Sequence, residues 1–79
     1  MAGTGVAHYR ARKDLTQAAI AQSLGVDAGR MSRIEKGEII PTAAEVDALV
    51  GLLDVPPSYL FSKNILAEVA DRAREAAAS

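Results

Sequence analysis

Cysteine, tryptophan and long apolar runs are all missing from this chain of 79 residues. Without cysteine, neither disulfide bonds nor thiolate ligands to a metal can stabilise the fold. No apolar run approaches the ~20 residues that a membrane-spanning helix needs. The N-terminus has neither the basic start nor the apolar stretch of a signal peptide. We therefore expect a cytoplasmic protein with no membrane partner.

Aromatic residues are scarce, with one Phe and two Tyr, so the core must consist mainly of Ala, Leu, Val and Ile. Hydrophobic residues nevertheless make up 49% of the chain, which favours a folded domain over disorder. A chain this short buries only ~60–65% of its unfolded surface. Small domains without disulfides or metals often gain stability by forming oligomers. The composition therefore predicts one domain over residues 1–79 and gives a weak indication of a homodimer.

Recognisable catalytic patterns are also absent from the sequence. His8 is the only histidine, and no Asp, Glu or Ser is placed around it in a catalytic arrangement. There is no paired-carboxylate motif, Gly-rich phosphate loop or metal-ligand spacing. We interpret His8 as a surface or phosphate-contacting residue, and we expect no enzymatic activity, cofactor, metal or small-molecule ligand.

The net charge of −1 conceals an uneven distribution of charged residues. Residues 1–36 carry six Lys and Arg against three Asp and Glu, whereas residues 37–79 carry three against seven. One interpretation is a basic face separate from an acidic face. The other is chance variation across a solvated surface.

Capping residues and glycines divide the first half of the chain into three predicted helices. A brief helix begins near Val6 and ends near Lys13. Thr16 is a suitable N-cap for a second helix, and Gly25 ends it as a left-handed C-cap would. Asp27 is the next N-cap, and the third helix ends before Gly37.

The second half predicts three further helices. Thr42 and Glu45 have the spacing of a capping box, and Val46, Leu49, Val50 and Leu53 follow as a stripe that faces the core. Residues 54–57 end this helix because proline disfavours helical geometry in the residue before it. Pro57 suits the first turn of a short fifth helix that turns Leu60 and Phe61 inward. Asn64 is a candidate cap for a sixth helix that continues to about Ala77. The fold class is therefore all-α.

Residues 16–36 contain two short helices joined by a glycine turn, which is the pattern of a helix-turn-helix unit. In such a unit the second helix enters the major groove of DNA. At 100° per residue, Met31 and Ile34 of the helix at about 27–36 point together and must be buried. The opposite face then carries small residues at the beginning of the helix and basic residues at its end. Its candidate base-reading residues are Ala28, Gly29, Ser32 and Arg33.

Phosphate contacts are expected around this helix. Arg30 and Lys36 flank it, and Gln17 lies in the first turn of the preceding helix, where backbone N–H groups point outward. Arg10 and Lys13 complete the predicted set. An alternative reading of Gln17, Arg33 and Lys36 is that they are ordinary solvated residues.

The chain resembles the Cro/C1-type (XRE) helix-turn-helix family over about residues 6–61. The resemblance rests on Arg10, residues 15–17, 20–21, 24–26 and 31–38, Pro41, Leu49, Val55 and Leu60. It implies a compact five-helix, lambda-repressor-like DNA-binding domain, to which the segment 64–77 adds a C-terminal helix. It also implies that Gln17 contacts phosphate, that the four candidate residues read bases, and that Arg10 and Glu35 form a structural ion pair.

The sequence departs from the family pattern at three points. Ala28 and Gly29 stand where relatives often carry longer polar residues, so side-chain readout depends heavily on Arg33. Gly29 costs about 1 kcal/mol relative to Ala inside a helix, which makes sense if the backbone approaches DNA closely. The chain also begins only a few residues before Val6, so the first helix is short, and a truncated start is one explanation.

The sequence therefore predicts sequence-specific binding to double-stranded DNA by a small transcriptional regulator, as a homodimer on a palindromic operator. The apolar stripe of the sixth helix packs either on its own domain or on a second chain. The candidate dimer contacts are Leu60, Phe61, Ile65, Leu66 and Val69. The alternative function is a protein-interaction module, antitoxin-like or regulator-binding, that uses the same fold with little direct DNA readout.

Overall fold

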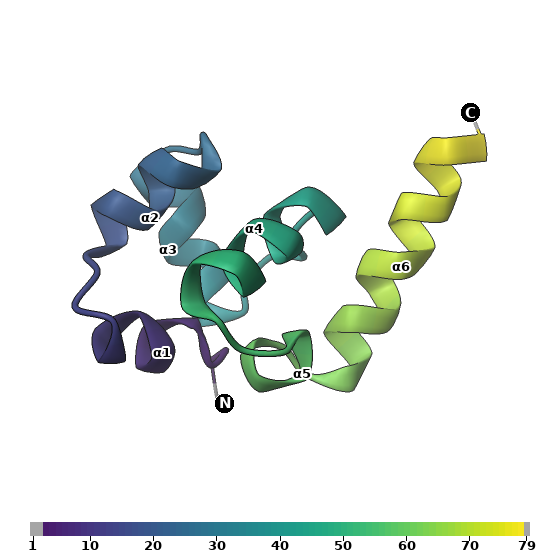
Figure 1. Cartoon of the computed structure of the whole chain (residues 1–79). Coiled ribbons are helices and arrows are strands. Elements are labelled where there is room, and N and C mark those ends of the chain that lie inside the picture. The colour runs from purple at the N-terminus through teal and green to yellow at the C-terminus, as the bar shows by residue number, and fades with distance from the viewer. Residues whose placement is uncertain (1–2, 79) are drawn as a thin grey trace.

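The computed structural model describes residues 3–78, which form helices and, within that range, no strand. The all-α prediction is confirmed; residues 1, 2 and 79 of the predicted domain lie outside the described part. Helices one to five form the body, and the sixth helix leans away from it towards its C-terminal end (Figure 1). The helices are α1 (Val6–Arg12), α2 (Gln17–Leu24), α3 (Ala28–Lys36), α4 (Ala43–Leu53), α5 (Pro57–Leu60) and α6 (Lys63–Ala78).

Three predicted N-caps are present and fix where helices begin. The Thr16 hydroxyl accepts a hydrogen bond from the Ala19 N–H at 3.0 Å, and Asp27 Oδ1 accepts one from the Arg30 N–H at 2.7 Å. Thr42 and Glu45 form the reciprocal capping box at the start of α4. Because each cap satisfies a backbone N–H that the helix leaves free, the start of each helix is set by local sequence.

The ends of α2 and α3 are set by Gly25 and Gly37. Their φ angles are 74° and 75°, in the left-handed region that favours glycine. Each glycine ends its helix within a residue of the predicted boundary, and the turn between α2 and α3 has the length of a helix-turn-helix connection.

The predicted cap of α6 is wrong by two residues. The helix begins at Lys63, and the Ser62 hydroxyl, not the Asn64 side chain, accepts a hydrogen bond from the Ile65 N–H at 3.2 Å. Phe61 is extended and its side chain is buried in the core, so the chain turns into α6 immediately after it. Asn64 is therefore already inside the first turn.

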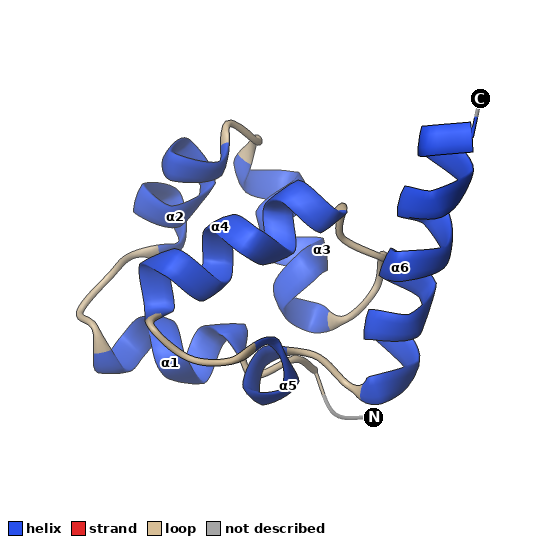
Figure 2. Cartoon of the chain, turned by 45° about the vertical axis from the view of Figure 1, so that its right-hand side comes forward, coloured by secondary structure: helices blue, strands red, loops and turns tan. Residues whose placement is uncertain are grey.

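The buried side chains form one apolar cluster to which every helix contributes. Met31 and Ile34 of α3 and Leu49 of α4 are fully buried, whereas Val50 of the predicted α4 stripe is only half-buried. α6 packs against α4 and α5, and Val69 is its one buried residue among those described (Figure 2). The cluster comprises Val6, Ile20, Ala21, Met31, Ile34, Val46, Leu49, Leu53, Leu60, Phe61 and Val69.

Three of the predicted dimer contacts belong instead to this core. Leu60, Phe61 and Val69 are only 1%, 3% and 7% exposed in the single chain, so they offer almost no area to a partner. Ile65 and Leu66 are half-buried against the same cluster. The burial of Leu60 and Phe61 does not support their predicted role as dimer contacts: Leu60 ends α5, Phe61 follows it as an extended residue, and both side chains enter the core. The large apolar side chain that α5 exposes is Tyr59.

The segment before α1 is held between α3 and α5. The Gly5 N–H donates to the Leu60 carbonyl at 2.8 Å, and the Thr4 N–H and hydroxyl both donate to the Glu35 carbonyl. A Cβ at Gly5 would lie too close to the carbonyl oxygen of Tyr59, so only glycine fits this approach.

Among the described residues, no helix has both the length and the apolar character needed to cross a bilayer.

Candidate nucleic-acid interface

The orientation of α3 follows from the two apolar side chains that it buries. Met31 and Ile34 are both 0% exposed, and they anchor one side of the helix in the core. The opposite side therefore faces solvent. Ala28, Gly29 and Arg33 are exposed there, and Ser32 is half-buried. All four predicted base-reading residues thus lie at the surface, on one helix.

The exposed side of α3 has the predicted gradient from small to basic. Ala28 and Gly29 leave the first turn without bulk, and Arg33 and Lys36 place two cations in the last turn. Neither cation forms an ion pair with any residue of the described range 3–78. Both are therefore available to an anionic ligand, and the small residues allow that ligand to approach the backbone of α3.

Arg10 and Glu35 form an ion pair that fastens α3 to α1. Arg10 Nε donates to Glu35 Oε2 at 2.8 Å, and its Nη2 donates to Oε1 at 3.2 Å. Its Nη1 also donates to the Leu15 carbonyl. The arginine side chain is 22% exposed and that of the glutamate 7%. This geometry gives Arg10 a structural role and does not support its predicted phosphate contact.

Gln17 joins the same cluster from the first turn of α2. Its side-chain amide donates to Glu35 Oε1 at 3.2 Å, so one buried carboxylate accepts hydrogen bonds from both α1 and α2. The predicted phosphate contact of Gln17 must use its second amide hydrogen or its backbone N–H. The bond to Glu35 fixes the direction in which that amide points.

Arg30 and Glu45 form a second ion pair, which fastens α3 to α4. Arg30 Nε and Nη2 donate to the two carboxylate oxygens of Glu45 at 2.7 and 2.8 Å. The hydrogen bonds from Arg30 lower the pKa of Glu45 below its ordinary value; burial opposes this, and the Thr42 N–H at 2.8 Å adds to it. This bidentate pair gives Arg30 a structural role, and its phosphate contact stays a prediction.

The remaining basic residues of α1 lie elsewhere. Lys13 is the exposed C-cap of α1 and lines a shallow groove with Tyr9 and Asp54 rather than joining the α2–α3 unit. Its phosphate contact stays a prediction. His8 is exposed and packs edge-on against Tyr9, with ring centroids 4.8 Å apart.

The sequence did not reveal the partners that hold α3 in place. The sequence predicts Glu45 only as part of a capping box, and Gln17 as a phosphate contact or an ordinary solvated residue, although both also bind across the fold. Arg30 and Glu45 are 15 residues apart and Gln17 and Glu35 are 18 apart, so no helical periodicity connects them. The sequence therefore carries no local pattern that could have identified these contacts.

The comparisons with known proteins agree with this arrangement. The helix-turn-helix domain family matches residues 3–59. The crystal structure of the restriction-modification controller protein C.AhdI from Aeromonas hydrophila is similar, with a TM-score of 0.62 and 26% identity over 72% of this chain and 86% of that one. No curated protein matches the chain. The chain therefore belongs to the helix-turn-helix domain family, as its resemblance to Cro/C1-type proteins predicted.

Proposed function

We propose that this protein is a small transcriptional regulator that binds double-stranded DNA in a sequence-specific manner, as a homodimer on an operator of two-fold symmetry. Its recognition helix, residues 27–36, lies in the major groove. The observation that carries the proposal is the orientation of α3. Burial of Met31 and Ile34 leaves Ala28, Gly29, Ser32 and Arg33 together at the surface.

Each exposed residue of α3 has a distinct part in this proposal. Arg33 donates two parallel hydrogen bonds to the O6 and N7 atoms of a guanine, and Ser32 donates to or accepts from a neighbouring base. Ala28 and Gly29 let the start of the helix approach the base edges closely. Lys36 and Gln17 contact the flanking phosphates, which set the register of the helix on the duplex.

The two ion pairs support this function from behind the reading face, which is the exposed side of α3 with Ala28, Gly29, Ser32 and Arg33. Arg10–Glu35 and Arg30–Glu45 connect α3 to α1 and α4, so the helix keeps its direction when it meets DNA. Groups held in place before binding lose less freedom on binding. The cluster around Glu35 also directs the Gln17 amide, so it couples phosphate contact to the position of α3.

A homodimer follows from the small size of one reading face. One recognition helix reads only a few base pairs, and two half-sites about 34 Å apart are the usual solution. The similar structure is that of a restriction-modification controller protein, and its name fits a regulatory role.

The test is a titration of fluorescent duplexes, after selection of preferred sequences from a random pool. We expect Arg33→Ala to lower specific affinity by about 1–3 kcal/mol and to relax base choice at one position. Arg74→Ala removes the same charge from α6 and should leave both unchanged. Binding should also weaken steeply as salt rises, because phosphate contacts release counterions. Unchanged base preference in Arg33→Ala would remove this residue from base reading.

A second candidate function is supported by the short side chains of Ala28 and Gly29. They leave few side chains that could contact bases directly, and a protein-interaction module of the same fold would need no contacts to bases at all. The salt dependence separates the two functions. A chain that retains no duplex at low ionic strength, yet binds a protein partner, would favour the second candidate.

A further inference from the structure

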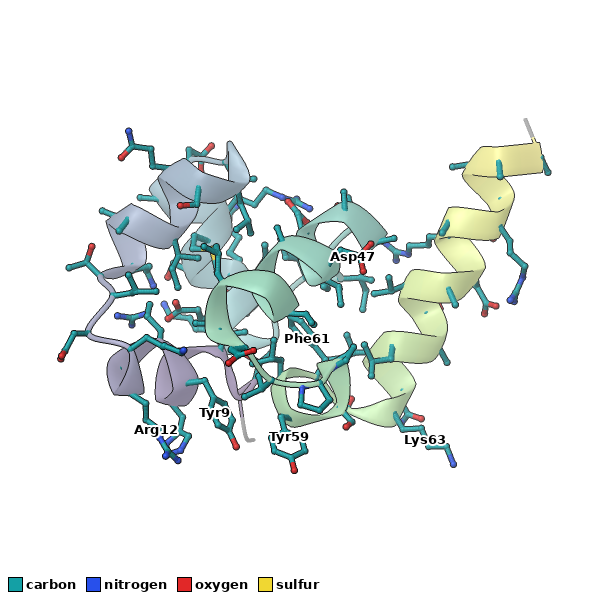
Figure 3. The ribbon with its side chains drawn as sticks, in the orientation of Figure 1. Tyr9, Arg12, Asp47, Tyr59, Phe61 and Lys63 are labelled. Atoms are coloured by element: carbon teal, nitrogen blue, oxygen red, sulfur yellow. The ribbon has the colours of Figure 1, made fainter. Side chains whose placement is uncertain are left out.

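Two tyrosines, Tyr9 half-buried and Tyr59 exposed, meet on a surface that the DNA-binding proposal does not use. Tyr9 of α1 and Tyr59 of α5 have ring centroids 5.9 Å apart, and His8 packs edge-on against Tyr9. Tyr59 is 57% exposed. The side chains of Tyr9, Arg12 and Tyr59 point to the same side, along the lower edge of the molecule (Figure 3). Both tyrosines of the chain therefore meet at this surface, although only the ring of Tyr59 is largely open to solvent.

The cluster lines a shallow groove of about 380 Å³ whose lining includes charges of both signs. Arg12 and Lys13, at the end of α1, are its basic residues. Asp54, at the end of α4, provides an acidic group beside Val55. Within the described residues, neither Arg12 nor Asp54 has an ion-pair partner. The groove therefore combines two tyrosine rings with charges of both signs that have no ion-pair partner among the described residues.

We propose that this aromatic groove, formed by Tyr9, Arg12, Lys13, Asp54, Val55 and Tyr59, is where a second copy of the chain docks. A two-fold interface brings the same patch of both copies together, so the patch must be complementary to itself. Here the Arg12 of each copy meets the Asp54 of the other, and the tyrosines pack between the two charge pairs. Tyrosine and arginine are also the residue types that dominate binding energy at protein interfaces.

A second groove competes for this role and fits it less well. It has a volume of about 650 Å³ and lies between α6 and residues 39–44. Its charged groups include Arg30 and Arg72, which already pair with Glu45 and Glu68 of the same chain. Because both cations already have partners, this groove has no free charges of opposite sign that could pair across a two-fold axis. A second copy could bind there only through apolar packing.

The position of the aromatic groove is compatible with DNA binding. Its residues come from α1, α4, α5 and the loop between α4 and α5, and none comes from α2 or α3. The hydrogen bond from Gly5 to Leu60 ties the start of α1 to α5, so the two tyrosines are held on connected elements. A partner on this groove leaves the reading face of α3 free. The inference rests on the proposed function for its biological meaning, but self-association itself is measurable without DNA.

The experiment is sedimentation equilibrium of the full chain without DNA, over a wide range of concentrations. We expect a dimer whose dissociation constant rises about tenfold or more in Tyr59→Asp and Arg12→Glu. Asp54→Asn should weaken it less; asparagine also accepts the left-handed backbone at this position, where φ is 58°. Arg74→Glu makes the same charge change on α6 and should have no effect. Circular dichroism establishes that each variant is folded.

Two results would overturn the inference. One is a chain that stays monomeric at every concentration, and the other is a dimer that Ala73→Glu, in the α6 groove, disrupts while Tyr59→Asp does not. Binding of Tyr59→Asp to a duplex carrying a single half-site should equal that of the wild-type chain. If self-association depends on Tyr59 but no duplex is bound, the interface stands and the DNA-binding proposal fails.

Discussion

The ion pairs of α3 and those of α6 use the same residue types for different ends. α3 contributes Glu35 and Arg30 to pairs with other helices, and the carboxylates of these pairs, Glu35 and Glu45, are each only 8% exposed. α6 pairs Glu68 with Arg72 and Asp71 with Arg74 within itself, and these four side chains are between 46% and 73% exposed. Pairs across the fold fix the direction of a helix, whereas exposed pairs within one helix support only that helix.

This difference explains which charges of α3 are free for a ligand. The half-buried pairs use Arg30 and Glu35 to hold the helix, so Arg33 and Lys36 are the cations of α3 that remain unpaired among the described residues. On α6 the charges lie on the solvated side. A charged residue near the reading face is therefore no evidence of DNA contact until its partners within the fold are known.

The largest effect should come from Glu35→Ala. The substitution leaves the Arg10 guanidinium half-buried without its carboxylate and releases the Gln17 amide. We expect the free energy of unfolding to fall by about 2–4 kcal/mol. Chemical denaturation measures it, with Glu75→Ala on α6 as the exposed control. A loss as small as that of the control would show that the two kinds of pair do not differ.

The second effect is a pH dependence that comes from Glu45. Its pKa in the folded state is lowered, first by the hydrogen bonds from Arg30, so its stabilisation is present above the ordinary glutamate pKa and is lost as pH falls through the folded-state pKa. At neutral pH, Glu45→Gln should lower the free energy of unfolding by about 1–2 kcal/mol. The difference in the free energy of unfolding between wild type and variant should disappear in acid. A gap that stays constant with pH would contradict a lowered pKa for Glu45.

A third, smaller effect separates the exposed side of α3 from that of α4. Gly29→Ala adds a methyl group on the exposed side, 3.3 Å from the Asp27 Oδ1 that caps α3, whereas Gly51→Ala in α4 meets no described residue within 4 Å. Gly51→Ala should therefore stabilise the fold by up to ~1 kcal/mol, and Gly29→Ala should gain less because its methyl group crowds the cap. Only Gly29→Ala should weaken binding to duplex DNA, because its methyl group occupies the space in which the backbone meets the base edges. Equal binding by both variants would show that α3 does not approach DNA at this position.

The smallest effect should come from the pairs of α6. Removing the exposed Glu68 by Glu68→Ala should change the free energy of unfolding by no more than about 0.5 kcal/mol. The same denaturation experiment measures it, and added salt should reduce the difference further. A loss comparable with that of Glu35→Ala would remove the distinction between the two helices.

The sequence predicted what neighbouring residues decide and missed what distant residues decide. Thr16, Asp27 and Thr42 cap helices through contacts three residues away, so their roles could be read directly. The pairing of Arg30 with Glu45 joins two helices and depends on how α4 packs beside α3.

The errors near α5 and α6 have the same origin. The sequence correctly predicts that Leu60 and Phe61 turn inward, and their burial leaves almost no area for the dimer contacts that it also predicts. Ser62 and Asn64 are both good caps, and the position at which Phe61 enters the core selects Ser62. The aromatic groove was missed because Tyr9 and Tyr59 are 50 residues apart and meet only after folding.

The most direct test of the central claim is an NMR titration of the isotopically labelled chain with its selected duplex at moderate salt. If the side of α3 opposite Met31 and Ile34 meets DNA, the largest changes in amide chemical shift should fall at Ala28, Gly29, Ser32 and Arg33 and at the first turn of α2. The amides of α6 should change little. Changes centred on α6 or on the aromatic groove, with α3 unaffected, would contradict the claim.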